Sequence, residues 1–386
     1  MITTEAWVLE RGPDEGGSAL DMGGFKKELY SFPDLEDDEM LVEPLFGCWE
    51  GNMSHALARR PIDVCRRRGE ERIVLGNSGV VRVLQAGTLV TEVKEGDVGV
   101  LFSAGKVDDF GFMIQALAYD TPGTTGALAK RIKIRARSFA PIPPESTYSY
   151  EQWAAHSLRY ATAWSNWKVA HGAYRLQVSE DEDPAPHVWG WSGGTTFAEV
   201  DLARRHGCRV AMLSGSDARL ETIAKAGIVG IDRRRFPDIE LDQDRYGADP
   251  TYKKLYQASE GALLREVKER TQGKGVAIFI DYLGAPVLRA TLKALAREGV
   301  LATAGWMLGM MTHVNRAIEC MHRHIHVHTH YARRSEMIEA MDYSVRTGWM
   351  PEVNEIYDWE DVPRLARAAA ASTTRSFCPV YRVNPV

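Results

Sequence analysis

The segment Val188-Trp-Gly-Trp-Ser-Gly-Gly-Thr-Thr-Phe-Ala198 combines an apolar strand, a glycine-rich turn and the start of a helix. Gly190 permits a tight turn after the strand. Gly193 and Gly194 remove side chains, so a pyrophosphate can approach the backbone N–H groups and the helix N-terminus. Thr196 stands where a third glycine often sits, so its side chain must be tolerated against the neighbouring strand. We assign the dinucleotide-binding turn to Gly190, Ser192, Gly193, Gly194 and Thr195.

The end of the following strand selects between the two nicotinamide dinucleotides. An Asp or Glu about twenty residues after the turn would bind the ribose 2′-hydroxyl of NAD. This chain instead has Leu213-Ser-Gly-Ser-Asp-Ala-Arg219. Ser214 and Ser216 are small donors, and Arg219 supplies a planar fork that suits a 2′-phosphate. Asp217 lies beyond the strand end, where it can cap the next helix. The pattern favours NADPH.

Histidines are concentrated in one segment near the C-terminus. Five of the eleven are His322, His324, His326, His328 and His330, which share one face if the segment is a strand. Side chains two residues apart on a strand are about 7 Å from one another, so the five cannot all bind one ion. We therefore expect a strand here and no metal site.

Composition and charge exclude several classes of protein. Forty-seven basic and fifty-two acidic residues give a net charge of −5, which argues against a nucleic-acid footprint. No apolar run reaches the roughly eighteen residues of a membrane span, and the N-terminus does not resemble a signal peptide. The cysteines have no C-x-x-C pairing and fit reduced thiols; they are Cys48, Cys65, Cys208, Cys320 and Cys378. We expect a cytoplasmic globular protein without nucleic-acid or membrane partners.

The elements that position these residues fall into two patterns. The chain before residue 160 is predicted to be β-rich, with short runs punctuated by Gly and Pro. After Val188, strands alternate with helices, which is typical of βαβ units and a parallel sheet. The predicted strands are 208–213, 228–231, 276–280, 300–304 and 325–330, and the helices are 218–226, 260–271 and 285–298. The polar stretch 232–259 is interpreted as an insertion.

Four further landmarks occur in order along the chain: Glu95-Gly-Asp97, Arg159-Tyr-Ala-Thr-Ala-Trp164, Asp281-Tyr-Leu-Gly284 and Gly299-Val-Leu-Ala-Thr-Ala-Gly305. With the glycine turn, they make the whole chain resemble a medium-chain dehydrogenase/reductase. The resemblance implies an α/β fold with a GroES-like catalytic domain at 1–160, completed by 326–386. A Rossmann domain with a doubly wound parallel sheet is implied at 161–325, with the active site between the two domains. It also places Thr162 and Gly305 at the cofactor.

The resemblance is closer to members of the family that lack zinc. Zinc-containing members hold their catalytic metal with a Cys, the His of a Gly-His-Glu motif, and a later Cys or Asp. Cys48 matches the first ligand, but the second motif reads Gly76-Asn-Ser78 and the third position falls near Leu158. One ligand of three cannot hold zinc. The chain therefore resembles the zinc-less branch, which contains quinone reductases and enoyl-thioester reductases.

Within that branch the chain is most similar to the enoyl-CoA reductase and crotonyl-CoA carboxylase/reductase group. Both the insertion and the segment His328-Thr-His-Tyr-Ala-Arg333 support this, and the segment places His330 on the group's active-site histidine. Carboxylating members also have a Phe-Glu pair where this chain has Tyr119-Asp120, and an Asn where it has Cys48. The resemblance therefore implies reduction without fixation of CO2.

The implied chemistry is hydride transfer from NADPH to the β-carbon of an α,β-unsaturated acyl thioester, carried by CoA or an acyl-carrier protein. The thioester oxygen then needs a hydrogen-bond donor and the α-carbon a proton. The predicted catalytic set is His330, Cys48 as a lining thiol, Glu50 as proton donor, and Asn52 and Asn77 as donors to the thioester.

Three alternatives remain open: a quinone or enone reductase, a carboxylating enoyl-thioester reductase, and a protein that keeps the fold without turnover. The family implies a homodimer, for which the strand 300–304 is a candidate edge.

Overall fold

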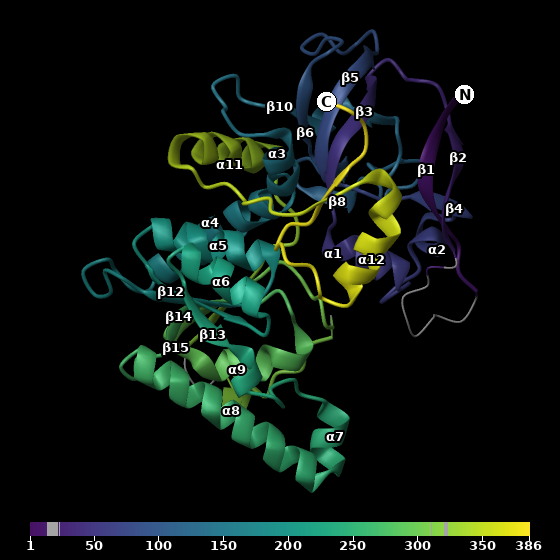
Figure 1. The fold of residues 1–386 in the computed structure, drawn as a ribbon. Helices are drawn as coiled ribbons and strands as arrows, with labels where there is room; N and C mark the ends of the chain where they lie inside the picture. Colours follow the sequence, from purple (N-terminus) through teal and green to yellow (C-terminus); the bar gives the residue numbers. More distant parts are fainter. Residues whose placement is uncertain (14–21, 23, 310, 320–322) are drawn as a thin grey trace. The chain divides into compact units, whose positions relative to one another are not determined.

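The computed structural model describes residues 1–13, 22, 24–309, 311–319 and 323–386, which form two compact units (Figure 1). Unit 1 comprises Met1–Ala161 and Ala332–Val386, and unit 2 comprises Thr162–Tyr331. The chain returns to unit 1 at Ala332 rather than at residue 326, because strand β16 (Ile325–His328) still belongs to the sheet of unit 2.

Unit 1 is the β-rich unit. Its strands are β1 (Ile2–Glu10), β2 (Phe25–Phe32), β3 (Glu39–Cys48), β4 (Arg72–Val74), β5 (Gly79–Ala86), β6 (Val98–Leu101), β7 (Ala104–Val107), β8 (Met113–Ala116), β9 (Ile132–Arg135), β10 (Phe139–Pro141), β17 (Ile356–Tyr357) and β18 (Val380–Arg382). Its helices are α1 (Gly51–Leu57), α2 (Val64–Arg68), α3 (Tyr150–His156), α11 (Arg334–Thr347) and α12 (Val362–Ala370). The largest sheet has the order β10-β6-β5-β3-β18-β17, with β9 also paired to β3. Because β18 pairs antiparallel with β3, placing Val380 opposite Cys48, the C-terminal segment completes the N-terminal sheet.

Unit 2 is built on a six-stranded parallel sheet. The strands are β11 (His187–Trp191), β12 (Arg209–Ser214), β13 (Val229–Asp232), β14 (Val276–Ile280), β15 (Leu295–Thr303) and β16. The helices are α4 (Arg159–Arg175, which begins in unit 1), α5 (Gly194–Arg205), α6 (Asp217–Lys225), α7 (Gln243–Ala248), α8 (Pro250–Arg270), α9 (Ala285–Ala294) and α10 (Arg316–Glu319). The order β13-β12-β11-β14-β15-β16 reverses direction between β11 and β14. Open α/β sheets bind ligands outside the carboxyl ends of the strands at such a point.

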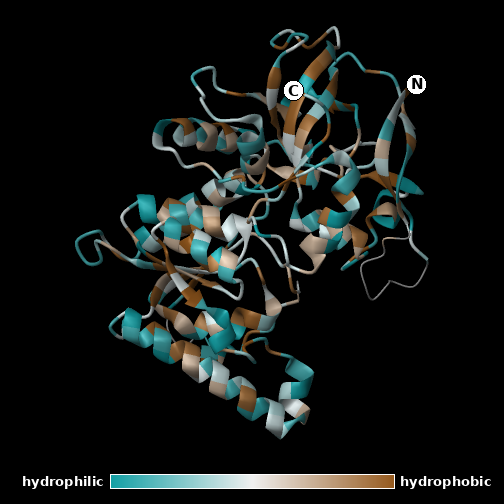
Figure 2. Cartoon of the chain, in the orientation of Figure 1, coloured by the Kyte–Doolittle hydropathy of each residue, from teal (hydrophilic) through white to brown (hydrophobic). Residues whose placement is uncertain are grey.

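The core of unit 2 lies between the sheet and its helices. Trp189, Trp191 and Phe279 are fully buried there, and the strands carry the hydrophobic colouring of Figure 2. Trp191 donates a hydrogen bond to the Thr291 hydroxyl at 2.8 Å, so its polar edge is satisfied inside the core. The predicted α/β class, with a β-rich domain and a Rossmann-type domain, is confirmed.

The polar stretch 232–259, interpreted as an insertion, contains α7 and the start of α8, which begins at Pro250. The expected edge strand 300–304 is internal, because β15 pairs with both β14 and β16. No helix among the described residues has the length and apolar character needed to cross a membrane.

Candidate functional site

The glycine turn of unit 2 is shaped by a close fit between Gly190 and Thr196. A Cβ atom added to Gly190 would lie 2.3 Å from Cγ2 of Thr196, so only glycine leaves room for that methyl group. Thr196 is fully buried and occupies the space above the strand, while Gly193 caps α5. The turn therefore reaches the helix N-terminus with its backbone open, which is the arrangement that receives a pyrophosphate. Ser192 and Thr195 are half-buried in the same turn, beside Gly194.

The carboxyl end of β12 lies beside this turn. Ser192 donates a hydrogen bond to the Ser214 hydroxyl at 3.4 Å, and the Ser216 backbone N–H donates to the same hydroxyl at 3.4 Å. Arg219 lies half-buried on α6. The structure therefore brings the predicted residues Ser192, Ser214 and Ser216 together at the predicted edge.

Sequence reasoning missed Arg234, whose guanidinium lies close to this edge. Its Nε and Nη2 donate to Asp232 at 2.8 and 2.9 Å, and Nη2 also donates to Asp217. These hydrogen bonds lower the pKa of both carboxyl groups. A Cβ atom on Gly215 would come within 4.0 Å of the Arg234 side chain, so the guanidinium's stem approaches the β12 turn. The Arg-rich run was interpreted as part of an insertion, although it directly follows a sheet strand.

A partly buried polar pair follows β14. Tyr282 donates a hydrogen bond to Oε2 of Glu199 on α5. Burial raises the pKa of the Glu199 carboxyl group well above its usual range. A Cβ atom on Gly305 would lie 3.4 Å from Tyr282, which places the predicted cofactor residue Gly305 next to this pair. The pair joins α5, β14 and the turn after β15.

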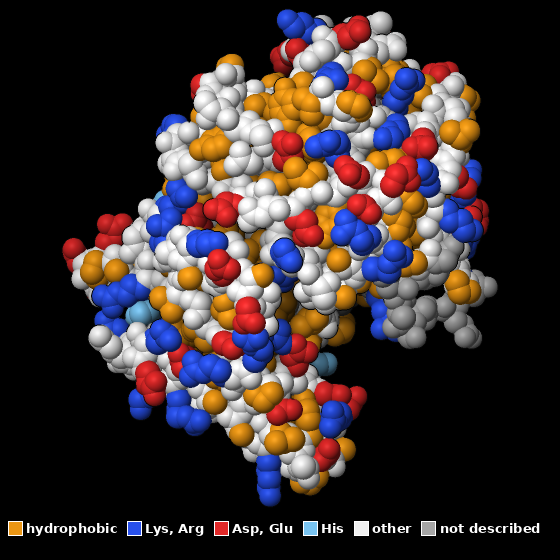
Figure 3. All heavy atoms as spheres, viewed as in Figure 1, with side chains coloured by type: hydrophobic (Ala, Val, Ile, Leu, Met, Phe, Trp, Pro, Cys, Tyr) orange, Lys and Arg blue, Asp and Glu red, His pale blue; other side chains and the backbone are white. Residues whose placement is uncertain are grey.

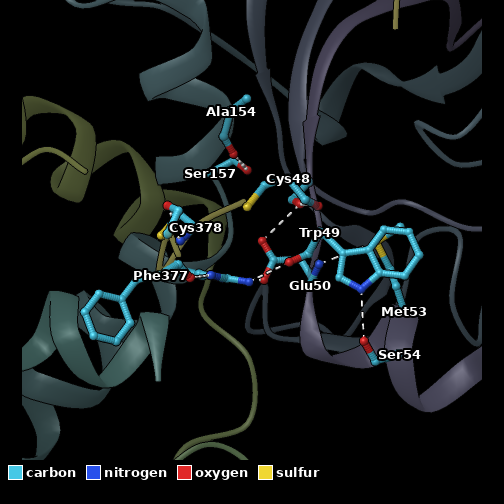
Figure 4. Close-up of polar contacts among 12 residues, drawn as sticks. Cys48, Trp49, Glu50, Met53, Ser54, Ala154, Ser157, Phe377 and Cys378 are labelled. Carbon is cyan, nitrogen blue, oxygen red and sulfur yellow. Dashed lines mark hydrogen bonds and ion pairs between the residues drawn. The ribbon is translucent and has the colours of Figure 1, made fainter. Parts of the chain in front are cut away.

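In unit 1, the predicted active-site loop is organised by a buried ion pair (Figure 4). Arg159 binds Oε2 of Glu50 at 2.8 Å and donates to the carbonyl oxygens of Trp49, at 2.6 Å, and Phe377. The Ser78 hydroxyl donates to the other Glu50 oxygen at 3.1 Å. Both carboxylate oxygens are therefore occupied, and Glu50 acts as the counter-ion of Arg159.

The two thiols of this region are also buried. Cys48 is fully buried at the end of β3, and burial, with Glu50 nearby, raises the pKa of its thiol well above the usual range. Cys378, which precedes β18, is also buried and forms no disulfide among the described residues. The Cys48 thiol is therefore packed in its neutral form. The predicted thiol Cys320 lies outside the described residues.

The donors in this loop do not fit a zinc ion. Burial keeps the Cys48 thiol neutral, the amide of Asn77 stands at the position of the histidine ligand, and Leu158 has no ligating atom. The Arg159 guanidinium lies in the same cluster and would repel a divalent cation. Across the part of the chain that the structure describes, no group of three His, Cys, Asp or Glu residues is arranged to hold a metal.

The remaining predicted residues are placed individually. Asn77 is buried and Asn52 half-buried in unit 1, and within the described residues the Oδ1 atom of each has no hydrogen-bond partner. Thr162 is the first residue of unit 2 and lies on α4. His330 is exposed just after β16, with its ring centroid 4.2 Å from that of Tyr331.

The histidine segment forms a strand only from Ile325 to His328. His326 and His328 are exposed while the intervening Val327 is buried, so the two histidines share a face as predicted. The rings of His324 and His326 are 6.4 Å apart. His322 lies outside the described residues.

The fold and one family model show what this chain is similar to. Residues 197–345 match the family model of zinc-binding dehydrogenases, and solved structures share the fold, with a β-rich and a Rossmann-type domain, that the resemblance implied. The family's name mentions zinc, but the donor set of this chain does not fit the metal.

Two solved structures and one curated protein are similar to this chain over most of its length. A 2-octenoyl-CoA carboxylase reductase from a Streptomyces species, solved with NADP and 2-octenoyl-CoA, has a TM-score of 0.80 and 20% identity, covering 98% of this chain and 87% of that one. A crotonyl-CoA carboxylase/reductase solved with NADP has a TM-score of 0.77 and 19% identity, covering 98% and 94%. The squalestatin hexaketide synthase of Cochliobolus lunatus is 22% identical over 306 residues, which are 79% of this chain and 9% of the synthase. The chain thus spans under a tenth of that relative's length.

Proposed function

We propose that the protein uses NADPH to reduce the C=C bond of an α,β-unsaturated acyl thioester, without carboxylation. The observation that carries the proposal is the geometry at the carboxyl ends of β11 and β12. There the glycine turn lies beside Ser214, the last residue of β12, which stands where an NAD-binding site would have a carboxylate. Relatives solved with NADP and with an acyl-CoA support the choice of cofactor and of substrate class.

Each group of residues has a proposed task. The Gly193–Gly194 backbone would hold the pyrophosphate at the N-terminus of α5. Ser214, Ser216, Arg219 and Arg234 would hold the 2′-phosphate, because guanidinium groups bind phosphate oxygens in pairs. Thr162 and Gly305 are assigned to the nicotinamide side. When bound, NADPH would supply the hydride.

The substrate side relies on amide groups and solvent. Asn52 and Asn77 are proposed to donate hydrogen bonds to the thioester oxygen as negative charge develops there. Glu50 does not fit the role of proton donor, because its two carboxylate oxygens accept hydrogen bonds from Arg159 and Ser78. We propose that the α-carbon takes its proton from solvent and that the exposed His330 assists that exchange.

The test is NADPH oxidation with three substrates: crotonyl-CoA, a crotonyl thioester of an acyl-carrier protein, and a quinone. Turnover of either thioester supports the proposal, and the preferred carrier identifies the partner. Turnover of the quinone alone would establish the quinone-reductase alternative. No NADPH binding at all would contradict the proposal.

Carboxylation is the second candidate, because two of the structural relatives are carboxylase/reductases. The chain's own residues argue against it. Cys48 stands buried and neutral where the resemblance expects an Asn, and Asp120 accepts a hydrogen bond from the Ala116 backbone at 2.6 Å within a turn. Reaction in deuterated water with labelled bicarbonate separates the two. We expect one solvent deuteron at the α-carbon, whereas labelled carboxylate as the main product would establish carboxylation.

We further propose that the protein acts in the cytoplasm as a homodimer. The four cysteines that the structure describes are buried and form no disulfide with one another, in keeping with a reducing compartment. Sedimentation equilibrium would measure the oligomeric state.

A further inference from the structure

A single buried amide joins helix α4 to two neighbouring strands of unit 2. Asn166 is fully buried, and its Nδ2 donates hydrogen bonds to the carbonyl oxygen of Thr303 at 3.1 Å and to the hydroxyl of Thr329 at 2.6 Å. Thr303 is the last residue of β15, and Thr329 directly follows β16. One side chain therefore fixes the carboxyl ends of two adjacent strands to the same helix.

The orientation of this amide follows from its partners. A backbone carbonyl oxygen can only accept, so the nitrogen of Asn166 must face Thr303. The same carbonyl oxygen also accepts from the Thr329 backbone N–H at 2.9 Å, and the Thr303 hydroxyl donates to the Gly305 carbonyl oxygen at 3.1 Å. These bonds link the turn after β15 to the segment after β16.

The Asn166 side chain is held in a way that lowers stability, because one of its two polar atoms lacks a partner in the part of the chain that the structure describes. Oδ1 of Asn166 is buried and has no hydrogen-bond partner among the described residues. A buried acceptor without a partner is destabilising, whereas an apolar side chain of similar shape would avoid that penalty. A buried amide retained at such a cost needs a reason beyond stability.

The position of the two threonines supplies that reason. The strand order reverses between β11 and β14, which divides the sheet into two nucleotide-binding halves. The glycine turn and Ser214 mark β11 and β12 as the adenosine half. The nicotinamide half then falls on β14, β15 and β16, where Thr303 and Thr329 lie.

We propose that Asn166 is a positioning residue for the nicotinamide half of the cofactor site. It holds the backbone after β15 and β16 in the geometry that receives the nicotinamide, without contacting the cofactor itself. This inference rests on the proposed function. Misplacement of a reacting group by about 1 Å can cost as much as a hundredfold in rate, so a rigid frame at this edge matters more than its contribution to stability.

The chain offers a matched control in Gln177. Its Nε2 also donates to a β15 backbone carbonyl, that of Glu298, at 3.0 Å, and its Oε1 is likewise buried without a partner in the described residues. Glu298 lies within β15, away from the carboxyl end where Thr303 stands. Asn166→Leu and Gln177→Leu thus remove equivalent amides at two places along the same strand.

The experiment compares binding of NADPH with binding of 2′,5′-ADP, which contains only the adenosine half. We expect Asn166→Leu to weaken NADPH binding roughly tenfold or more and to lower kcat, while 2′,5′-ADP binds as in the wild type. Gln177→Leu should leave both ligands unaffected. Thr329→Val, which removes only the 2.6 Å hydrogen bond and alters packing little, should show a smaller loss in the same direction.

Two outcomes would overturn the inference while leaving the proposed function intact. NADPH binding and kcat unchanged in Asn166→Leu would show that the amide does not position the site. Equal weakening of both ligands in Asn166→Leu and Thr329→Val would show general damage to unit 2. A wild-type protein that bound neither ligand would contradict the proposed function itself, and this inference with it.

Discussion

The two units treat their polar groups in opposite ways. In unit 1, Glu50 and Arg159 form a closed cluster in which both carboxylate oxygens are occupied and the guanidinium also binds two carbonyl groups. In unit 2, no described side chain caps the N-terminus of α5, and the exposed Arg234 forms ion pairs with Asp217 and Asp232. Buried polar groups whose hydrogen bonds are all made within the protein stabilise a loop. Exposed polar groups at the edge of a sheet can instead replace their protein partners with those of a ligand. Variants should therefore affect stability in unit 1 and cofactor binding in unit 2.

The largest effect is expected from Arg159→Met. Removing one partner of a buried ion pair leaves the other charge uncompensated, which typically costs about 3–5 kcal/mol. We expect the free energy of unfolding of unit 1 to fall by that order in urea denaturation, with NADPH affinity of the folded protein unchanged. The exposed pair Lys225–Glu221 is the control, because Glu221→Gln removes a solvent-screened surface interaction and should leave stability nearly unchanged.

The double variant Arg159→Met with Glu50→Gln sharpens this result. With both charges gone, no buried ion lacks a partner, so stability should be partly regained. If the single and double variants were equally destabilised, the ion pair would not be the source of the effect. If either variant lost NADPH affinity while folded, the contrast between the two units would fail.

The next effect concerns the glycine turn. Gly190→Ala would place a methyl group 2.3 Å from Cγ2 of Thr196. Overpacking of this kind costs about 1–3 kcal/mol, and we expect it to appear as a roughly ten- to hundredfold loss of NADPH affinity in a fluorescence titration. The double variant with Thr196→Gly should recover binding, because it removes the methyl group that clashes.

Gly172 provides the matched control for this substitution. A Cβ atom at Gly172 on α4 would meet nothing within 4 Å, so Gly172→Ala should leave NADPH binding unchanged. Failure of Thr196→Gly to rescue Gly190→Ala would mean that the fit between these two residues does not shape the turn.

A smaller effect is expected for the choice between NADPH and NADH. The wild type should bind NADPH at least roughly tenfold more tightly, because Ser214 ends β12 where an acidic residue would select NAD. Arg219→Ala and Arg234→Ala should each weaken NADPH and leave NADH nearly unchanged. Isothermal titration of both cofactors measures this, and equal losses for NADPH and NADH would refute the 2′-phosphate assignment.

Strands, turns and helix starts that depend on neighbouring residues could be predicted from the sequence. Hydrogen bonds between residues far apart in the chain could not. The strand Val276–Ile280 was predicted at its observed limits, and the glycine turn falls where its motif indicated. The early start of α8 had a local signal that was overlooked. Pro250 is its first residue, and the Asp249 carboxylate caps it by accepting from the Thr251 and Tyr252 backbones at 2.9 and 3.1 Å.

The partners of the buried polar groups had no such signal. Glu50 and Arg159 are 109 positions apart, and Asn166 and Thr329 are 163 positions apart, so only the fold brings them together. For the same reason, sequence alone allowed Glu50 to be a proton donor. The Arg159 contact that changes this interpretation forms only when the fold of unit 1 brings residue 159 beside the loop after β3.

The smallest expected effect is that of removing metal ions. Of the three positions that hold zinc in related enzymes, this chain has one thiol, Cys48, whose pKa is raised by burial, one amide, Asn77, and the apolar Leu158. A zinc ion would need a deprotonated thiolate and further ligands, and it would have to displace the Arg159–Glu50 pair. Exhaustive treatment with a chelator should therefore leave turnover unchanged, and elemental analysis of the untreated protein should find no stoichiometric zinc. If zinc were bound and its removal abolished activity, the Arg159–Glu50 cluster would have to open to admit a metal. Unit 1 would then bind a ligand through these polar groups, which contradicts the contrast drawn between the two units.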